Sequence, residues 1–425
     1  MPGTYQQTLS ALYALEARKG MDFRLSRLDP VLAVLDHPER AFACVHIAGT
    51  NGKGSTASMI ESALRAGGHR TGLYTSPHLV SFRERVRVGG VPITQEAVVR
   101  HVEDVRAAME SAHEDLTFLE IATLAAFLEL RERRVDIAVI EAGLGGRLDV
   151  TNVVYGDVAV ITSVGIDHAE FLGSTIATVA SEKAAIIKPG SVAVTGALDA
   201  EADAVVAARV AEVGVRRLAF GYDFDAFAPL LAGQAAQASG PRGLAGLHQV
   251  RNAAVAAAAV GALAGRFPVS DADRDRGILE VRWPGRLEVL GRRRGDGPLV
   301  LDAAHNPEAA SALALCLDQV APQRPRVLVF AAMVDKDWRA MLGVLAPHFD
   351  RIVVTSLAMR RAERPERFLE SVPAALVAAD PGSALDLAED AASAHGSIVV
   401  AGSIFLLGNL YRAAGGTLLE EDLAD

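Results

Sequence analysis

Short hydrophobic runs alternate with longer helical patterns along most of the chain. Eight runs of β-branched or apolar residues predict buried strands, at Cys44–Ile47, Ile137–Ile140, Val158–Ser163, Val192–Thr195, Leu299–Leu301, Val327–Phe330, Ile352–Thr355 and Ile398–Ala401. Helical periodicity falls between them, at Ser55–Ala66, Phe118–Arg133, Ile176–Ile187 and Val250–Ala264. Such alternation indicates an α/β protein built of βαβ units, with mostly parallel sheets covered on both faces.

Two domains are expected, because 425 residues exceed the size of one ordinary core. The stretch Arg292–Pro298 interrupts the pattern with three arginines, two glycines and a proline. We therefore predict a first domain over 1–292, a linker over 293–298 and a smaller domain over 299–425. The segment Leu218–Gly246 is irregular and predicts a loop-rich or β-rich insertion.

Composition narrows the classes of function. The net charge of −10 argues against a nucleic-acid surface. Cys44 and Cys316 give neither a disulfide framework nor a metal-binding spacing, which fits a reducing cytosol. The alanine-rich run Ala253–Gly265 is too short to span a membrane, and Met1–Gly20 lacks the apolar core of a signal peptide. A cytoplasmic protein without membrane or nucleic-acid partners is expected.

A glycine-rich turn joins the first predicted strand directly to a helix. Its sequence over 49–55 is Gly-Thr-Asn-Gly-Lys-Gly-Ser. Backbone N–H groups of such a turn surround a polyphosphate, and a lysine contacts the outer phosphates. The turn departs from the strict phosphate-loop pattern, because Ile47 replaces the first glycine and Gly54 separates Lys53 from Ser55. We predict nucleotide binding by Thr50, Asn51, Gly52, Lys53, Gly54 and Ser55; the alternative is an ordinary strand–helix turn.

Polar residues also follow two other predicted strands. Glu141 precedes the segment Gly143–Asp149, and Asp167-His168 follows the strand that starts at Val158. Ligands of open parallel sheets bind beyond the carboxyl ends of the strands, so these side chains are expected at one edge with Lys53. Glu141 suits Mg²⁺, which prefers oxygen ligands. The alternatives are a turn-capping glutamate and a hydrogen-bonded core histidine.

The turn over 49–55 resembles that of the folylpolyglutamate synthases and dihydrofolate synthases, members of the Mur-ligase superfamily. Further matches follow in the family's order over nearly the whole chain, at Thr75–Leu79, Thr117–Glu120, Ile161–Gly173, Ser181–Lys188, His248–Ala254, Trp283–Arg286, Leu301–Pro307, Met333–Asp337 and Gly402–Ser403. The chain departs from the pattern at Ala185 and Ala303, where the family usually has glycine, and at Glu308-Ala309. The resemblance implies a P-loop ATPase-like N-terminal domain and a smaller Rossmann-like C-terminal domain.

The resemblance also implies roles for single residues. It implies ATP contacts by Asn252, Arg286 and Asp302, and metal contacts by Ser76, Glu141, His168 and a Lys183 carbamylated by CO₂. It places the pteroate moiety at Thr117, Phe118, Leu119, Glu120, Leu148, Asp149 and Val150, and glutamate near Ser403. Catalytic roles fall to Lys53, Glu141, His168, Lys183, Asp302 and His305.

Several of these residues also have purely structural interpretations. Thr117 and Glu120 form the pattern of a helix capping box. Lys183 taken alone is a solvated helix residue, and Arg286 suits an inter-domain salt bridge. Asn306 and Pro307 are an N-cap and first residue of a helix, which leaves Asp302 and His305 without such an explanation.

The predicted protein is an ATP-dependent ligase. ATP phosphorylates a carboxylate of dihydropteroate or of a folate's glutamate tail, and the amine of L-glutamate attacks the acyl phosphate. ATP, two Mg²⁺ sites and a monomer are expected. One alternative, a Mur-type UDP-sugar ligase, is disfavoured by Gly54 and Thr75–His78. The other, a non-catalytic nucleotide-binding regulator, is disfavoured by the intact Lys53, Glu141, His168 and Asp302. The sequence leaves open whether one or both folate activities are present.

Overall fold

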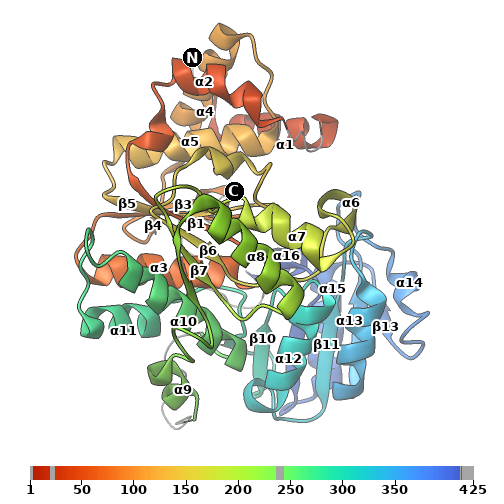
Figure 1. The fold of residues 1–425 in the computed structure, drawn as a ribbon. Helices are drawn as coiled ribbons and strands as arrows, with labels where there is room; N and C mark the ends of the chain where they lie inside the picture. Colours follow the sequence, from red (N-terminus) through yellow and green to blue (C-terminus); the bar gives the residue numbers. More distant parts are fainter. Residues whose placement is uncertain (1–2, 20–23, 236–243, 412, 414–425) are drawn as a thin grey trace. The chain divides into compact units, whose positions relative to one another are not determined.

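The computed structural model describes residues 3–19, 24–235, 244–411 and 413 (Figure 1). The chain divides into two compact units, Met1–Leu230 with Arg251–Val281, and Leu231–Val250 with Arg282–Asp425. None of the helices in the described part of the chain combines the length and apolar character that crossing a bilayer requires.

The first unit contains an eight-stranded sheet of order β4-β3-β2-β5-β1-β6-β7-β8. Only the pairs β2–β3 and β3–β4 are antiparallel. Its strands are β1 (Ala43–Ala48), β2 (Thr71–Tyr74), β3 (Val86–Val88), β4 (Val91–Pro92), β5 (Ile137–Glu141), β6 (Val158–Ile161), β7 (Val192–Thr195) and β8 (Arg216–Ala219). The central strands β1, β5 and β6 are buried throughout, which explains why they are almost entirely hydrophobic.

Helices pack on this sheet in separate groups. One core joins α1, α2, α4 and α5 to strand residues such as Cys44 and Ile140 (Figure 1). A second core joins residues of β6 and β7 to α7 and α8. The helices of this unit are α1 (Tyr5–Lys19), α2 (Leu28–Val34), α3 (Lys53–Ala66), α4 (Gln95–Ala112), α5 (Phe118–Glu132), α6 (Ala169–Leu172), α7 (Ile176–Ala184), α8 (Ala200–Val213) and α11 (Asp271–Glu280).

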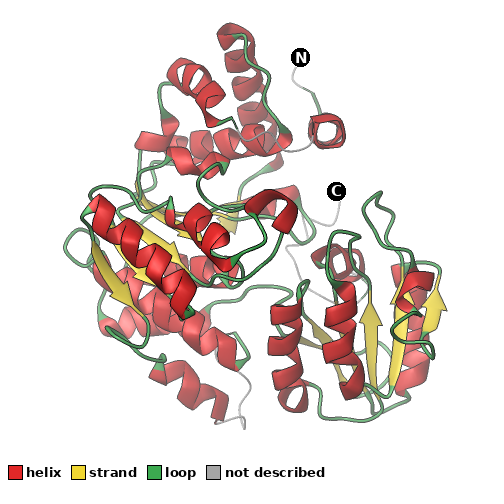
Figure 2. Ribbon diagram, turned by 45° about the vertical axis from the view of Figure 1, so that its right-hand side comes forward, coloured by secondary structure: helices red, strands yellow, loops and turns green. Residues whose placement is uncertain are grey.

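The second unit has a six-stranded sheet of order β13-β12-β11-β14-β10-β9, in which only β9 is antiparallel. Helices lie on both sides of its strands (Figure 2). The strands are β9 (Glu288–Gly291), β10 (Pro298–Leu301), β11 (Arg326–Phe330), β12 (Arg351–Thr355), β13 (Leu376–Ala378) and β14 (Ser397–Ala401). The helices are α12 (Pro307–Val320), α13 (Trp338–Leu345), α14 (Pro365–Phe368), α15 (Pro381–Ala392) and α16 (Ile404–Tyr411).

All eight predicted strands are present, and their ends move by two residues or fewer. The four predicted helices correspond to α3, α5, α7 and α10 (Leu247–Ala262); α7 ends at Ala184, three residues earlier than expected. The local spacing of hydrophobic residues thus identifies these strands and helices. The two mostly parallel sheets, with helices between their strands, confirm the predicted α/β fold class. The run Thr71–Tyr74, which is also strand-like in sequence, is β2. The strands β3, β4, β8, β9 and β13 did not stand out in the sequence, because they are short or border the sheets.

The stretch predicted as a linker lies inside the second unit. Residues 292–297 connect β9 to β10, which pair directly, and Pro298 already belongs to β10. The two units divide instead at Val281 and Arg282. Arg292 is buried and forms an ion pair of 2.8 Å with Glu389, whose side chain has no exposed surface. The arginines and glycines here form the loop of a hairpin between two paired strands. Their composition alone is also typical of a linker between domains, which is why the sequence suggested one.

The segment Leu218–Gly246 is helical in part. It contains the end of β8 and the helix α9 (Ala228–Ala235), so the expectation of a loop-rich or β-rich insertion is wrong for 228–235. The residues 236–243 of that prediction lie outside the described residues.

Candidate active site

The glycine-rich turn lies where β1 ends and α3 begins. Gly52 precedes α3 with a φ of 83°, in the left-handed region that favours glycine. A Cβ at Gly49 would lie 1.9 Å from the Thr162 hydroxyl oxygen, so only glycine allows the turn to approach β6 so closely. Lys53 starts α3, and the buried Gly54 and Ser55 follow in its first turn. The turn therefore presents backbone N–H groups at a helix N-terminus, as phosphate binding requires.

Hydrogen bonds to the segment after β6 fix the shape of this turn. The Thr50 hydroxyl donates to the Gly165 carbonyl and accepts from the Gly165 N–H, both at 2.9 Å. The carbonyl of Asn51 accepts from Thr162 Oγ1 at 2.7 Å. Lys53 Nζ donates to the carbonyls of Gly49 (3.0 Å) and Thr50 (3.4 Å), so its ammonium lies over the turn.

Asn252, on α10, lies against the same turn. A Cβ at Gly52 would be 2.5 Å from Asn252 Oδ1. The two segments are 200 residues apart in sequence, and the fold brings this predicted nucleotide contact to the phosphate turn.

Four predicted ligand residues converge on Gly143, just beyond β5. Glu141 ends β5, and its Oε2 accepts from the Ser76 N–H at 3.3 Å. A Cβ at Gly143 would lie 3.4 Å from both Ser76 Oγ and Asp149 Oδ2, and 3.5 Å from a methyl group of Leu119. The predicted metal and pteroate residues therefore lie side by side.

Asp149 is buried and held by a chain of hydrogen bonds that the sequence did not reveal. Its Oδ2 accepts from the Leu144 N–H at 2.8 Å, and its Oδ1 accepts from the Thr151 hydroxyl at 2.5 Å. Thr151 Oγ1 in turn lies 2.9 Å from Nε2 of His46, which is buried in β1. Burial raises the pKa of Asp149, and the hydrogen bonds oppose that shift. The one sign of this chain of hydrogen bonds in the sequence is His46, a polar residue inside the otherwise apolar strand β1. Leu148 and Val150 flank Asp149, and Val150 is buried.

The segment over 143–149 packs tightly against α7. A Cβ at Gly146 would lie 2.6 Å from the Glu182 carbonyl oxygen and 3.2 Å from Lys183 Cα. The Arg147 N–H donates to that carbonyl at 2.8 Å, and its guanidinium forms an ion pair with the Glu182 carboxylate. The glycines here serve close packing, which brings the carboxyl end of β5 to Lys183.

Lys183 is 2% exposed, contrary to the expectation of a solvated helix residue. Burial, followed by the charge of Lys53, lowers its pKa from 10.5 to about 7, while Asp167, Asp149 and Glu182 oppose the shift. Desolvation is the largest of these effects, so it lowers the pKa more than the nearby carboxylates raise it. A substantial fraction of the amine is therefore neutral at physiological pH.

His168 precedes α6 with a φ of 52°, an uncommon backbone conformation for a residue other than glycine. Its side chain is 28% exposed, and its Nε2 lies 4.0 Å from Asp167 Oδ1. The interpretation as a core histidine is therefore wrong. A partly exposed imidazole beside a carboxylate can bind a cation.

Thr117 and Glu120 form the capping box of α5 that the sequence predicts. The Glu120 carboxylate accepts from the Thr117 N–H at 2.7 Å and from Arg27 Nε at 2.9 Å. Glu120 is thus engaged in buried structural contacts. An open cavity of about 610 Å³ adjoins Thr117, and its lining includes Arg24, Arg27 and His113.

An aromatic cluster surrounds Phe118, the first residue of α5. The ring of Phe118 lies 5.7 Å from that of Tyr13 and 6.2 Å from that of Phe82. Arg85 places its guanidinium 5.3 Å from the Phe118 centroid and donates from Nε to His78 Nδ1 at 2.9 Å. Burial and then Arg85 lower the pKa of His78 to about 3, so its ring is neutral at physiological pH. In the sequence, His78 belongs to the motif Thr75–Leu79, whereas no motif contains Arg85 or Tyr13.

In the second unit, predicted residues gather beyond β10 and β14. Asp302 is buried and accepts from the N–H groups of Leu287 and Ala304, both at 2.9 Å. Burial raises the pKa of Asp302, and Arg286 opposes that shift. His305 Nδ1 lies 2.9 Å from the Ala303 carbonyl oxygen. The Gly402 N–H donates to the Ala304 carbonyl, which brings the buried Ser403 to the same edge.

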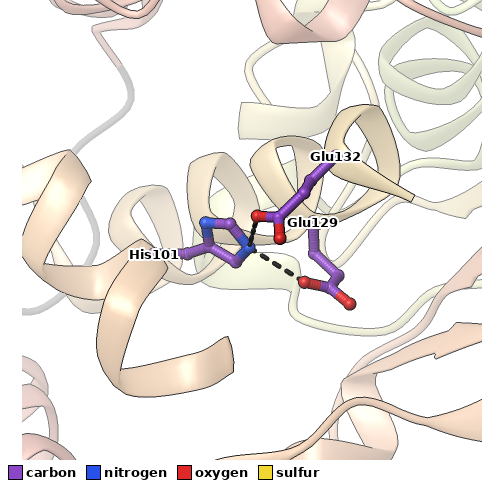
Figure 3. Close-up of side chains that lie close together, drawn as sticks. All are labelled: His101, Glu129 and Glu132. Carbon is purple, nitrogen blue, oxygen red and sulfur yellow. Dashed lines mark hydrogen bonds and ion pairs between the residues drawn. The ribbon is translucent and has the colours of Figure 1, made fainter. Parts of the chain in front are cut away.

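A separate cluster of His101, Glu129 and Glu132 joins α4 to α5 (Figure 3). His101 Nε2 lies 2.9 Å from Glu129 Oε2 and 3.3 Å from Glu132 Oε2. Arg100 contacts both Glu132 oxygens at 2.9 Å. Arg100 also lies 3.7 Å from Glu129 Oε2, so this cluster is explained as an ion-pair network between two helices.

The sequence matches two family models. Residues 47–260 match the Mur ligase middle domain, and residues 285–404 match the Mur ligase, glutamate ligase domain. Folylpolyglutamate synthase of Lacticaseibacillus casei is 35% identical over 431 residues, which cover 96% of this chain and 97% of the relative.

Two solved structures extend the similarity to the whole fold. Escherichia coli FolC in complex with DHPP and ADP has a TM-score of 0.85 and 30% identity, covering 96% of this chain and 97% of that one. The bifunctional folylpolyglutamate synthase/dihydrofolate synthase of Yersinia pestis, complexed with AMPPNP and Mn, has a TM-score of 0.84 and 28% identity, covering 97% and 99%.

Proposed function

Because the chain belongs to the folylpolyglutamate synthase and dihydrofolate synthase family of Mur ligases, we propose that the residues at the carboxyl edges of its two sheets perform that family's reaction. The protein is an ATP-dependent ligase that joins L-glutamate to a folate. It uses ATP and a divalent metal ion. The assignment of single residues, a second metal site and a lysine carbamate are our proposals.

In the first step, a carboxylate oxygen of the folate attacks the γ-phosphorus of ATP, and ADP leaves. Lys53 and the N–H groups of the turn over 49–55 stabilise the charge on the phosphoryl oxygens, because the turn is held rigidly and needs little reorganisation. Asn252, beside Gly52, contacts the nucleotide. In the second step, the amine of L-glutamate attacks the acyl carbon, phosphate leaves, and a proton leaves the nitrogen.

The residues around Gly143 fit a divalent cation. Glu141 supplies an anionic oxygen and Ser76 a hydroxyl oxygen. We propose that His168, whose partly exposed imidazole lies beside Asp167, is a further ligand. A bound cation supplies positive charge to the phosphoryl and carboxylate oxygens. We propose two such positions, one shared with ATP and one at Glu141, His168 and Lys183.

We also propose that Lys183 carries a carbamate. A neutral amine attacks the carbon of CO₂: the N–C bond forms, one C=O electron pair moves to oxygen, and the nitrogen loses a proton. The product is an anion, which replaces a positive charge by a negative one beside the cation. The burial of Lys183 among Lys53, Asp149 and Asp167, with its lowered pKa, is the observation that carries this proposal.

Substrate contacts complete the proposal. We assign binding of the pteroate moiety to Thr117, Phe118, Leu119, Leu148, Asp149 and Val150. Glu120 positions Thr117, because its carboxylate accepts a hydrogen bond from the Thr117 N–H. In the second unit, Arg286 and Asp302 contact ATP, His305 orients a reactant, and Ser403 lies at the glutamate site. A cytoplasmic location and a monomeric state also stand as proposals. Two buried free cysteines support a reducing compartment.

A substrate panel tests the function. The purified protein is given ATP, Mg²⁺, L-glutamate and one acceptor, chosen from dihydropteroate, tetrahydrofolate and a UDP-sugar peptide. Release of ADP with formation of a glutamyl amide is expected for one or both pteridine acceptors. Turnover of the UDP-sugar alone would support the other Mur-ligase activity, and no turnover of any acceptor would contradict the proposal.

A further inference from the structure

Arg85 is a buried cation whose hydrogen bonding is incomplete. It ends the short 3₁₀ helix Phe82–Arg85, which links the loop after β2 to β3, and it is 6% exposed. Its Nε donates to His78 Nδ1 at 2.9 Å. Its Nη1 is buried and has no hydrogen-bond partner among the described residues.

Aromatic rings surround the guanidinium but leave this donor unsatisfied. The guanidinium carbon lies 5.6 Å from the ring centroid of Phe82 and 5.3 Å from that of Phe118. Ring faces attract the cation electrostatically, but they do not replace an acceptor for its N–H groups, which lie in the guanidinium plane. Tyr13, at 38%, is the most exposed ring and marks the side facing solvent.

No carboxylate of the described residues pairs with Arg85. Glu84, its neighbour, is occupied by the N–H groups of Leu79, Val80 and Ser81. Glu120, near Phe118, is occupied by Thr117 and Arg27. Burying a charge without its partner is costly, and such groups persist where a ligand completes the hydrogen bonds.

We propose that Arg85 anchors the pterin ring of the substrate, donating from its unsatisfied Nη1 to the ring's carbonyl oxygen or to the adjacent nitrogen. This inference rests on the proposed folate activity and adds a specificity-determining residue to it. A guanidinium pairs well with a carbonyl oxygen beside a ring nitrogen, the arrangement that arginine recognises in guanine. The rings of Phe82, Phe118 and Tyr13 suit a flat heteroaromatic ligand better than an acidic chain.

Binding measurements separate the pterin from the rest of the substrate. Calorimetry with ADP and Mg²⁺ present compares 7,8-dihydropteroate with p-aminobenzoyl-L-glutamate, which lacks the pterin. We expect Arg85→Met to weaken dihydropteroate binding about tenfold or more and to leave p-aminobenzoyl-L-glutamate unchanged. Arg85→Lys keeps the charge but loses the planar donor edge, so it should also bind dihydropteroate more weakly than the wild type. Equal weakening of both ligands, or of neither, would overturn the proposal.

Stability distinguishes a ligand-binding role from a structural one. Arg85→Met removes an uncompensated charge, so its melting temperature should stay unchanged or rise. The matched control is Arg83→Met, since the buried Arg83 donates from Nε to the Ile93 carbonyl. This control should melt at a lower temperature and bind dihydropteroate normally. A fall for Arg85→Met as large as the control's would overturn the proposal. Turnover by the wild type is measured separately, so absence of folate ligation would refute the proposed function and not the binding result.

Discussion

Two buried cations of this protein have opposite surroundings. Arg292, in the β9–β10 hairpin of the second unit, has its charge matched by the Glu389 carboxylate. Its N–H groups also donate to four carbonyl oxygens, those of Gly396, Arg294, Glu389 and Ser393. Lys183, beside the phosphate turn of the first unit, is also buried, but desolvation dominates its electrostatics. A fully paired buried charge serves the fold. An under-compensated one has an altered pKa and is available for chemistry.

The largest effect is expected at Lys183. Lys183→Ala should reduce kcat by about 10³-fold, because it removes the proposed anionic ligand beside the reacting phosphoryl group. Lys183→Arg should be as inactive, since arginine forms no carbamate and leaves a fixed positive charge. Steady-state ADP release measures both. An active Lys183→Arg enzyme would refute the carbamate, and partial recovery of Lys183→Ala with added short carboxylic acids would support it.

The lowered pKa sets the conditions for this modification. An ordinary lysine is half neutral near pH 10.5, whereas Lys183 is half neutral near pH 7, so its reactive form grows as the pH rises from 6 to 8. With ¹³C-bicarbonate, a carbamate carbon signal should appear over that range in the wild type and be missing in Lys183→Ala. A signal of equal size in both proteins would assign it to another amine.

In the β9–β10 hairpin we expect a loss of stability without a loss of activity, the reverse of the effect expected at Lys183. Glu389→Ala strands the buried Arg292 and should lower the free energy of unfolding by about 3–5 kcal/mol, measured by denaturant titration. Folded enzyme should keep a nearly normal kcat. The matched control is Asp390→Asn, which breaks the exposed pair with Arg294 and should cost about 0–1 kcal/mol. Equal losses for both variants would remove the contrast with Lys183.

Lys53→Ala should affect turnover without affecting the fold. Loss of a charge-assisted phosphate contact is expected to cost about 3 kcal/mol in the transition state, roughly a hundredfold in rate. Among the described residues, the Lys53 ammonium donates only to backbone carbonyls of its own turn, so the melting temperature should change little. Near-normal ADP release by the folded variant would contradict the assignment of the phosphate turn.

The smallest effect is expected for the metal ligands taken one at a time. Glu141→Gln and His168→Ala should each raise the Mg²⁺ concentration for half-maximal activity by about tenfold, because each removes one contact worth roughly 1.5 kcal/mol. Magnesium titrations of ADP release give both midpoints. Unchanged midpoints in both variants would show that these side chains do not share a cation site.

The sequence by itself determined the elements and the phosphate turn. Hydrophobic period and glycine position are local properties, and they identified β1, β5, β6, the start of α3 near Lys53 and the capping box at Thr117. Motif order also fixed the family, because each motif is a short contiguous segment.

Only the tertiary structure decided which of these residues lie within reach of one another and in what state. The burial of Lys183 depends on Gly146 packing against α7, and the setting of Asp149 depends on His46, 103 residues earlier. Arg292 belongs to a hairpin because β9 pairs with β10, whereas its local composition resembles a linker. The desolvation and ion pairing of a charged side chain depend on segments far away in the sequence, so a short stretch of sequence does not predict them. These two properties distinguish a structural charge from a reactive one.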